Sequence, residues 1–207
     1  MYTKYPRTYH LPWSEGVTDD DKVIRNLDSF LGRRVVVTEK MDGENTTMYS
    51  DHIHARSLDS RNHPSRNWVK RFWGGVKGNI PEGWRVCGEN LYAKHSLYYT
   101  DLPTYFMGFS IWDDSNVCLS WEETKEWFNL LDVTPVPVIY YGVFDEALLR
   151  NLKLNWAQQE GYVVRLADRI SYEDFSHKAA KFVRKNHVQT DKHWMHDSEV
   201  KANLLSQ

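Results

Sequence analysis

The sequence lacks the features of a membrane, secreted or metal-cluster protein. Its 207 residues include only two cysteines, Cys87 and Cys118, which have no metal-ligand spacing and are expected to be reduced structural thiols. No apolar stretch approaches membrane-spanning length, and the N-terminus has no apolar core of a signal peptide. These absences predict a soluble, cytoplasmic protein without a membrane partner.

The chain also lacks a glycine-rich turn between a strand and a helix, which argues against a doubly wound nucleotide fold. No repeat, low-complexity segment or flexible linker divides it. The predicted strands outnumber the predicted helices, and short turns join most of them. The expected fold class is therefore α+β, with largely antiparallel sheets flanked by helices.

Hydrophobic periodicity predicts three longer helices and one short one. The first runs from Thr18 to Leu31 with Gly32 as its stop, the second covers residues 65–76, and the third covers 120–131 behind a capping box at Ser120. A short helix is expected at 145–152. Strands are expected at about residues 34–39, 45–49, 52–56, 84–92, 104–112, 116–119, 136–140, 161–166 and 179–184.

The formal net charge of −2 hides an uneven distribution of charge. Basic residues outnumber acidic ones by six to two in residues 51–80 and by five to one in 176–194, whereas acidic residues dominate 113–132. This pattern predicts a polarised surface, although a solvated face is the simpler interpretation of any one segment.

One short stretch, Thr38–Asn45, presents a reactive group. The β-branched run Val35–Thr38 leads into Lys40, and a turn at Asp42 and Gly43 follows. Rigid backbone thus delivers a primary amine to the edge of a sheet, and such an amine becomes a nucleophile when burial or nearby cations lower its pKa. A surface lysine beside a turn is the alternative, and the K-x-D-G motif alone leaves it open.

Further charged groups lie at the ends of predicted strands or within them. Arg56, Glu89 and Glu160 each adjoin apolar runs, Lys181 lies among small and apolar residues, and Phe109 is on an aromatic-rich strand. Such groups tend to converge on one cleft, where a purine nucleotide needs an aromatic face, cations for its phosphates and acids for a metal. Taken singly, each could instead be a strand-edge charge, a core aromatic or part of a solvated edge strand.

In this order the motifs resemble those of the covalent nucleotidyltransferases, the superfamily of ATP-dependent DNA and RNA ligases and mRNA capping enzymes. The resemblance runs from about Thr38 to Lys185. Asn45 and the run Gly88–Ser96 are more similar to RNA ligases than to DNA ligases. The positions that match the nucleophile motif, the third motif, the aromatic after it, and the fourth and fifth motifs are Lys40, Glu89, Phe109, Glu160 and Lys181.

The resemblance implies an adenylyltransferase (ATP-grasp-like ligase) domain over residues 1–185, a short C-terminal extension over 186–207, and no OB domain. It implies that ATP adenylylates Lys40, that the adenylate moves to a 5′-phosphate, and that a 3′-hydroxyl displaces AMP. The implied activity is ATP-dependent joining of RNA ends, as in RNA repair. The implied cofactors are ATP and Mg²⁺, for which Mn²⁺ can substitute.

The resemblance also assigns roles to single residues. Lys40 and Lys181 are the implied catalytic residues, and Lys181 together with Mg²⁺ is expected to lower the pKa of Lys40. The fifth motif departs from the usual lysine pair, so that either Arg184 or Lys185 is left as its second cation. The implied nucleotide-binding residues are Glu39, Lys40, Asn45, Arg56, Glu89, Phe109, Glu160, Lys181 and Arg184, and the implied metal ligands are Asp42, Glu89 and Glu160.

RNA ends are the expected partner, and a need for an accessory or repair protein is left open. Five cations are expected to contact RNA: Arg61, Arg66, Lys70, Arg71 and Lys185. The interleaved Trp68, Phe72 and Trp73 either stack on bases or fill the core, and the core is preferred for the tryptophans. For His187, His193 and His196, RNA contacts or plain surface are preferred to a zinc site.

Two other functions compete with RNA ligation. A GTP-dependent capping guanylyltransferase is the first, and the expected lack of an OB domain argues against it. The second is a nucleic-acid-binding module with a decayed ligase site, which the presence of Lys40, Glu89 and Glu160 argues against.

Overall fold

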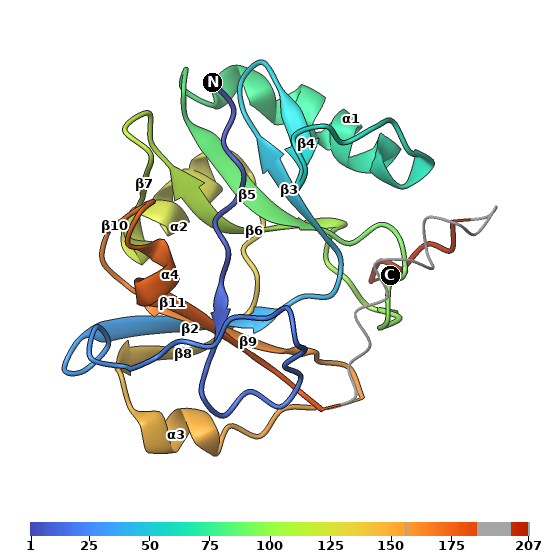
Figure 1. Cartoon of the computed structure of the whole chain (residues 1–207). Helices are drawn as coiled ribbons and strands as arrows, with labels where there is room; N and C mark the ends of the chain where they lie inside the picture. The colour runs from blue at the N-terminus through green and yellow to red at the C-terminus, as the bar shows by residue number, and fades with distance from the viewer. Residues whose placement is uncertain (156, 186–199, 207) are drawn as a thin grey trace.

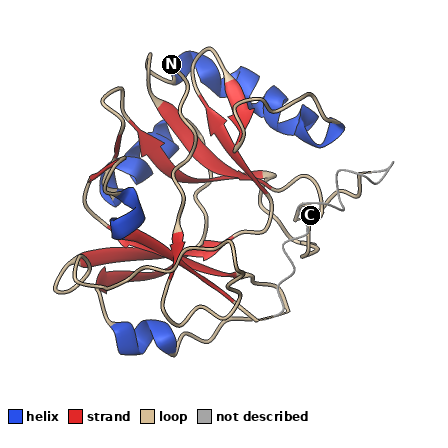
Figure 2. Cartoon of the chain, in the orientation of Figure 1, coloured by secondary structure: helices blue, strands red, loops and turns tan. Residues whose placement is uncertain are grey.

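A computed structural model describes residues 1–155, 157–185 and 200–206 of the chain. Within these residues the strands form two β-sheets, drawn one above the other in Figure 1. Four short α-helices lie at the outer edges of this pair of sheets, as Figure 2 shows. The architecture confirms the expected α+β class with largely antiparallel sheets.

The first sheet has the strand order β1-β11-β9-β2-β8. Every neighbouring pair in it is antiparallel except β1 and β11, which are parallel. Its central strands are therefore β11, β9 and β2, which carry the expected fifth, fourth and nucleophile motifs. The bounds are β1 Tyr9–His10, β2 Arg34–Lys40, β8 Val138–Val143, β9 Gly161–Leu166 and β11 Ala179–Val183.

The second sheet has the order β10-β7-β6-β5-β3-β4 and is antiparallel throughout. It places the strand of Glu89 between the strand of Asn45 and the strand of Phe109. The bounds are β3 Glu44–Met48, β4 Ile53–Ala55, β5 Arg85–Asn90, β6 Phe106–Trp112, β7 Val117–Cys118 and β10 Ile170–Ser171.

The helices mostly fall where the sequence predicts them. α2 begins behind Ser120, and the expected capping box with Glu123 is present. The aromatic residues of α1 pack against a buried cluster around Phe106, which agrees with the preference for a core position of its tryptophans. The bounds are α1 Asn67–Val76, α2 Trp121–Leu130, α3 Glu146–Arg150 and α4 Phe175–Lys178, with 3₁₀ turns at Pro64–Arg66 and Lys77–Asn79.

The predicted helix from Thr18 to Leu31 is wrong, because these residues form turns and bends. The side chain of Asp21 accepts a hydrogen bond from the main-chain N–H of Thr18 at 3.1 Å, which favours a local turn over a helix. Ile24 then donates its N–H to the carbonyl of His10 at 2.8 Å, so that this segment runs beside β1. The hydrogen bond between the Asp21 side chain and the backbone, and the pairing of this segment with β1, thus prevent the helix that the apolar periodicity predicts.

Residues 1–8 run past the second sheet before β1 joins the edge of the first one (Figure 1). Cys87 and Cys118 are both buried and free, as expected for structural thiols. Among the residues that the structure describes, none of the helices has the length and apolar character needed to cross a bilayer.

Candidate active site

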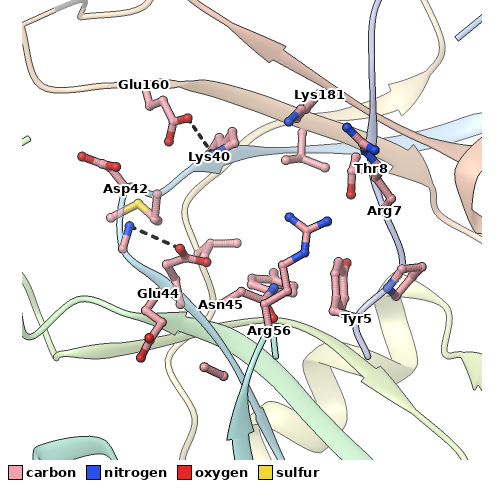
Figure 3. A pocket seen from close by; sticks show the side chains of 18 of the residues that line it. Tyr5, Arg7, Thr8, Lys40, Asp42, Glu44, Asn45, Arg56, Glu160 and Lys181 are labelled. Carbon is pink, nitrogen blue, oxygen red and sulfur yellow. Dashed lines mark hydrogen bonds and ion pairs between the residues drawn. The ribbon is translucent and has the colours of Figure 1, made fainter. Parts of the chain in front are cut away.

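A cavity of about 1110 Å³ opens between the two sheets. β2, β9 and β11 of the first sheet line one side, and β3, β5 and β6 of the second sheet line the other. Figure 3 shows Lys40, Glu160 and Lys181 on the first side, and Asn45 and Arg56 on the second. The cavity therefore collects most of the residues that the sequence motifs single out, although they are far apart along the chain.

The strand register explains why Lys40 and Glu160 meet. Lys40 is the last residue of β2 and lies opposite Gly161, the first residue of β9. Glu160 directly precedes that glycine, and its Oε1 lies 2.7 Å from the Nζ of Lys40. The Glu160 side chain is 2% exposed and the Lys40 side chain 23% exposed, so that the ion pair is largely shielded from water.

Lys181 joins this pair because β11 lies next to β9. Lys181 pairs with Val163 of β9, and Val163 pairs with Thr38 of β2. Alternate residues of a strand point to the same face, and all of these residues line the cavity. Gly161 allows the close approach of the strands, because a Cβ at this position would lie 1.9 Å from the carbonyl oxygen of Phe182.

The pKa of Lys40 differs from the expectation that nearby cations lower it. Burial lowers the pKa of Lys40, but the carboxylates of Glu160 and Glu89 raise it by more, and the net shift is upward. Instead, the pKa of Lys181 is lowered, by burial and then by the charge of Lys40. In this state Lys40 is an ammonium paired with Glu160.

Asn45 and Glu89 face each other across β3 and β5 of the second sheet. The Oδ1 atom of Asn45 is buried and has no hydrogen-bond partner among the described residues, although the residue lines the cavity. Glu89 accepts a hydrogen bond from the main-chain N–H of Gly43 at 3.2 Å. Burial raises the pKa of Glu89 to about 8, with Lys40 opposing and Glu160 and Asp42 adding to the shift.

Phe109, rather than Phe106, offers the aromatic face. Phe109 lines the cavity and makes an edge contact with Tyr5, with ring centroids 5.1 Å apart. Phe106 is fully buried on the other face of β6, where it packs near Phe72. The register of β6 thus places Phe109 at the cavity and Phe106 in the core.

Three carboxylates that were expected to bind metal, Asp42, Glu89 and Glu160, line the cavity. Among the described residues no group of three or more His, Cys, Asp and Glu side chains is arranged to hold a metal ion. This does not conflict with Mg²⁺, which takes one or two carboxylates and completes its shell with water and phosphate oxygens. Burial is the main cause of the raised pKa of Glu89, and repulsion from Glu160 and Asp42 adds to it, which fits a site that gains from a cation.

Of the other residues predicted to bind the nucleotide, two line the cavity and one does not. Arg56 follows β4 and points into the cavity (Figure 3). Glu39 also lines it and accepts a hydrogen bond from Gln159 at 2.9 Å. Arg184 does not line the cavity, because its Nε donates to the carbonyl oxygen of Gln159 at 3.2 Å.

The cations expected to bind RNA lie mostly away from the cavity. Arg66 lines the cavity, but it is bound to Glu44 through Nε at 2.7 Å and through Nη2. Lys70, on α1, donates to the side chain of Asn62. Arg61, Arg71 and Lys185 are exposed residues outside the cavity. The histidines at 187, 193 and 196 lie outside the described residues.

Sequence reasoning missed the contribution of the N-terminal segment. Arg7 and Asp21 line the cavity near Lys181, and Asp21 lies 3.8 Å from the ammonium of Lys181 and 3.9 Å from Arg7. The buried ring of His10, the residue opposite Lys181 in β1, also contacts Asp21, at 3.3 Å. The sequence pattern marks Asp21 only as part of the expected helix, and its place in the site follows from its proximity to β11 in space.

Together these groups place an amine, a carboxylate and a second cation in one cavity, those of Lys40, Glu160 and Lys181. A family model for RNA ligase matches residues 33–183, which include all of these residues. The chain belongs to the RNA ligase family. None of the curated proteins matches the sequence of this RNA ligase family member.

Solved structures of RNA ligases share the fold of this family member. A variant of the Naegleria gruberi RNA ligase with ATP and Mn is 19% identical, with a TM-score of 0.56, over 87% of this chain and 58% of that one. Another variant of the Naegleria ligase, without ligand, gives 17% identity and a TM-score of 0.57 over 91% and 59%. An archaeal ATP-dependent RNA ligase gives 16% identity and a TM-score of 0.57 over 88% and 48%.

The chain therefore spans between about half and three fifths of the length of these solved ligases. At this level of identity the likeness establishes the fold, while the activity rests on the chemistry of the site itself.

Proposed function

We propose that the protein adenylylates Lys40 with ATP and uses the adenylate to join RNA ends. The observation that carries this proposal is the 2.7 Å pair of Lys40 and Glu160, in a cavity that Phe109 and Lys181 also line. A shielded amine beside an acid, with an aromatic face and a second cation, meets the needs of nucleotidyl transfer. Membership of the RNA ligase family supports the same reaction.

In the proposed first step, Nζ of Lys40 attacks the α-phosphorus of ATP. A nitrogen–phosphorus bond forms, and the bond between the α-phosphorus and the oxygen of pyrophosphate breaks. The ammonium has to lose a proton before the attack, and the carboxylate of Glu160 is the nearest group that can receive it. Lys181 faces the same space and would stabilise the negative charge that builds up on the α-phosphate.

Asp42, Glu89 and Glu160 would hold Mg²⁺, or Mn²⁺ in its place, together with water and phosphate oxygens. When bound, the ion supplies positive charge that stabilises the phosphates and weakens the hold of the carboxylates on the proton of Lys40. The similar Naegleria structure contains ATP and Mn, which supports this assignment.

The other residues of the cavity fit a bound nucleotide. Phe109 would stack on the adenine, and Glu89 would bind the ribose hydroxyls. The unsatisfied Oδ1 of Asn45 offers an acceptor for a hydroxyl or amino group of the nucleotide. Arg56 would meet a phosphate, either of the nucleotide or of the RNA 5′ end.

In the later steps a 5′-phosphate oxygen takes the AMP from Lys40, and a 3′-hydroxyl then displaces AMP to form the phosphodiester bond. We propose RNA as the substrate because the solved structures that share the fold are RNA ligases and because the motif around Asn45 resembles theirs. Exposed cations on and beside α1, together with Lys185, would contact the RNA backbone. The buried, free thiols fit a reducing compartment, and the cytoplasm is part of the proposal.

The first step is tested by incubating the protein with radiolabelled ATP or GTP and Mg²⁺. We expect label from ATP on the parent and none on Lys40→Ala, while Lys153→Ala, which removes an exposed lysine outside the cavity, labels like the parent. Label retained on Lys40→Ala would refute the nucleophile. Label from GTP instead of ATP would favour the capping reaction, and no label at all would favour a decayed site.

The substrate is tested with matched nicked RNA, nicked DNA and single-stranded RNA. We expect sealing of RNA ends, with the 2′-hydroxyl of the 3′ nucleotide contributing most. Equal or faster sealing of an all-DNA nick would contradict this substrate. Strong self-adenylylation without any sealing would point to a required partner or an unusual end.

A further inference from the structure

The C-terminal segment, residues 200–206, packs against the loop of residues 91–105 that joins β5 to β6. The loop has no helix or strand of its own. Isolated β-bridges fix the segment to the loop at Ala93 and at Leu102. The segment thus provides hydrogen-bond partners for loop backbone that regular secondary structure does not satisfy.

Asn203 is the centre of this contact and is fully buried. Its Nδ2 donates to the carbonyl oxygens of Leu91 and Ala93, at 2.7 and 3.3 Å, and its Oδ1 accepts from the N–H of Tyr99 at 3.0 Å. Its own carbonyl accepts from the hydroxyl of Tyr105 at 2.9 Å. A single side chain therefore ties together both halves of the loop.

The same loop holds the turn that follows Lys40. The hydroxyl of Tyr99 accepts a hydrogen bond from the main-chain N–H of Asp42 at 2.9 Å. The N–H of Leu97 donates to Oδ2 of Asp42 at 2.6 Å. The ring of Tyr99 also packs against the buried cluster that contains Met41. Both the backbone and the side chain of Asp42 are thus held by the loop, two residues after the nucleophile.

We propose that the C-terminal segment is a positioning element of the active site, and that Asn203 acts through Tyr99 to hold the turn after Lys40. Asn203 orders the loop, Tyr99 and Leu97 fix Asp42, and Asp42 sets the end of the strand that presents the amine. This role rests on the proposed adenylyl transfer, which it deepens.

The effect on the reaction follows from the need for an accurate angle and distance of attack. A displacement of about 1 Å at a reacting group lowers a rate by roughly 10²-fold. Phe109 and Lys181, which would bind the base and the phosphates, lie on β6 and β11 and not on the loop or the C-terminal segment. Loss of Asn203 should therefore lower the maximal rate of adenylylation more than it raises the KM for ATP.

The test compares Asn203→Ala and Tyr99→Phe with Leu204→Ala in the full chain. Leu204 is a matched control because it lies next to Asn203 and its side chain is 48% exposed. Tyr99→Phe keeps the ring and removes only the acceptor for Asp42, so that it is informative even if Asn203→Ala folds poorly. The readouts are single-turnover adenylylation over a range of ATP and amide hydrogen exchange of residues 40–43.

We expect Asn203→Ala to lower the maximal rate by about ten- to a hundredfold with little change in KM, and Tyr99→Phe to do so more weakly. In both variants the amide of Asp42 should exchange faster, while β2 stays protected and Leu204→Ala resembles the parent. A rise in KM at an unchanged rate, or unchanged exchange at Asp42, would overturn the inference. A parent that takes no AMP would refute the proposed function, while hydrogen exchange would still test the link to Asn203.

Discussion

The carboxylate of Asp21 lies 3.8 Å from the ammonium of Lys181, in the cavity where the phosphates of a nucleotide are proposed to bind. The pair brings a residue of the N-terminal segment into contact with the fifth motif. Asp21 also lies near Arg7 and His10, so that it faces several of the positive or ionisable groups on this side of the cavity. An anionic ligand has to compete with Asp21 for these groups.

The first prediction follows from this competition. Asp21→Asn should lower the KM for ATP by about two- to fivefold, because a partly exposed ion pair contributes roughly 0.2–1 kcal/mol. Asp19→Asn is the matched control, since Asp19 is exposed and does not line the cavity. The measurement is the ATP dependence of adenylylation. A KM that rises would mean that Asp21 organises the cations for ATP rather than competing for them.

A second prediction concerns the ionisation of Lys40. Glu160 is the carboxylate that raises the pKa of Lys40 most, so that Glu160→Gln should lower this pKa and shift the amine's reactivity toward lower pH. The measurement is the pH dependence of acylation at Lys40 by an amine reagent without ATP, followed by mass spectrometry. Lys153 serves as an internal reference. The prediction fails if Glu160→Gln leaves the titration of Lys40 unchanged or moves it to higher pH.

A third prediction separates the two phenylalanines of β6. Phe109→Ala should raise the KM for ATP by about one to two orders of magnitude, since stacking on a base contributes roughly 1–3 kcal/mol. Phe106→Ala should instead lower the free energy of unfolding by about 3–5 kcal/mol, because it empties a buried site. Kinetics and denaturant unfolding of both variants check this. The opposite assignment would mean that the faces of β6 are exchanged.

A fourth prediction uses the raised pKa of Glu89. Because its pKa is about 8 in the folded protein and about 4.5 in a freely solvated glutamate, the folded state binds the proton more tightly. This contribution to stability is complete below about pH 4.5 and is lost as the pH rises through about 8. Without ligand, Glu89→Gln should therefore have a higher Tm than the parent above pH 8 and a similar one near pH 4.5.

The size of this difference is expected to be a few °C, since about 1 kcal/mol moves the Tm of a domain of this size by about 2–4 °C. Glu82→Gln is the control, because Glu82 is an exposed glutamate outside the cavity. Thermal unfolding across pH 4.5 to 9 measures both. A lower Tm for Glu89→Gln at high pH would show that the charged carboxylate stabilises the fold.

Much of the fold could be predicted because its signals are local. The β-branched run before Lys40 forms β2, and the capping box at Ser120 begins α2. The helix expected at Thr18–Leu31 failed because other hydrogen bonds replace the helical ones: Thr18 donates its N–H to the side chain of Asp21, and Ile24 donates its N–H to the carbonyl of His10. The apolar spacing does not mark one buried face, since Ile24 and Phe30 are buried whereas Val23 and Leu31 are exposed.

In the candidate site, too, some residues could be predicted from the sequence and others could not. Motif order pointed to Lys40, Glu160 and Lys181, which antiparallel pairing brings to one face. The position of Arg184 outside the cavity and the raised pKa of Lys40 could not be predicted, because both depend on which groups lie nearby in space. The same holds for Asp21 and Asn203, whose partners are distant in sequence and whose own surroundings carry no motif.

The contact between Gly161 and the carbonyl of Phe182 has a consequence for the meaning of the fourth motif. Its glutamate supplies the charge that holds Lys40, whereas its glycine sets how far β11 stands from β9. The separation between the two lysines is thus fixed by the smallest residue of the site. A methyl group at position 161 would push β11 away from β9 and so widen the distance between Lys40 and Lys181, without changing any polar atom. Glu160 and Gly161 therefore set the geometry of the site together.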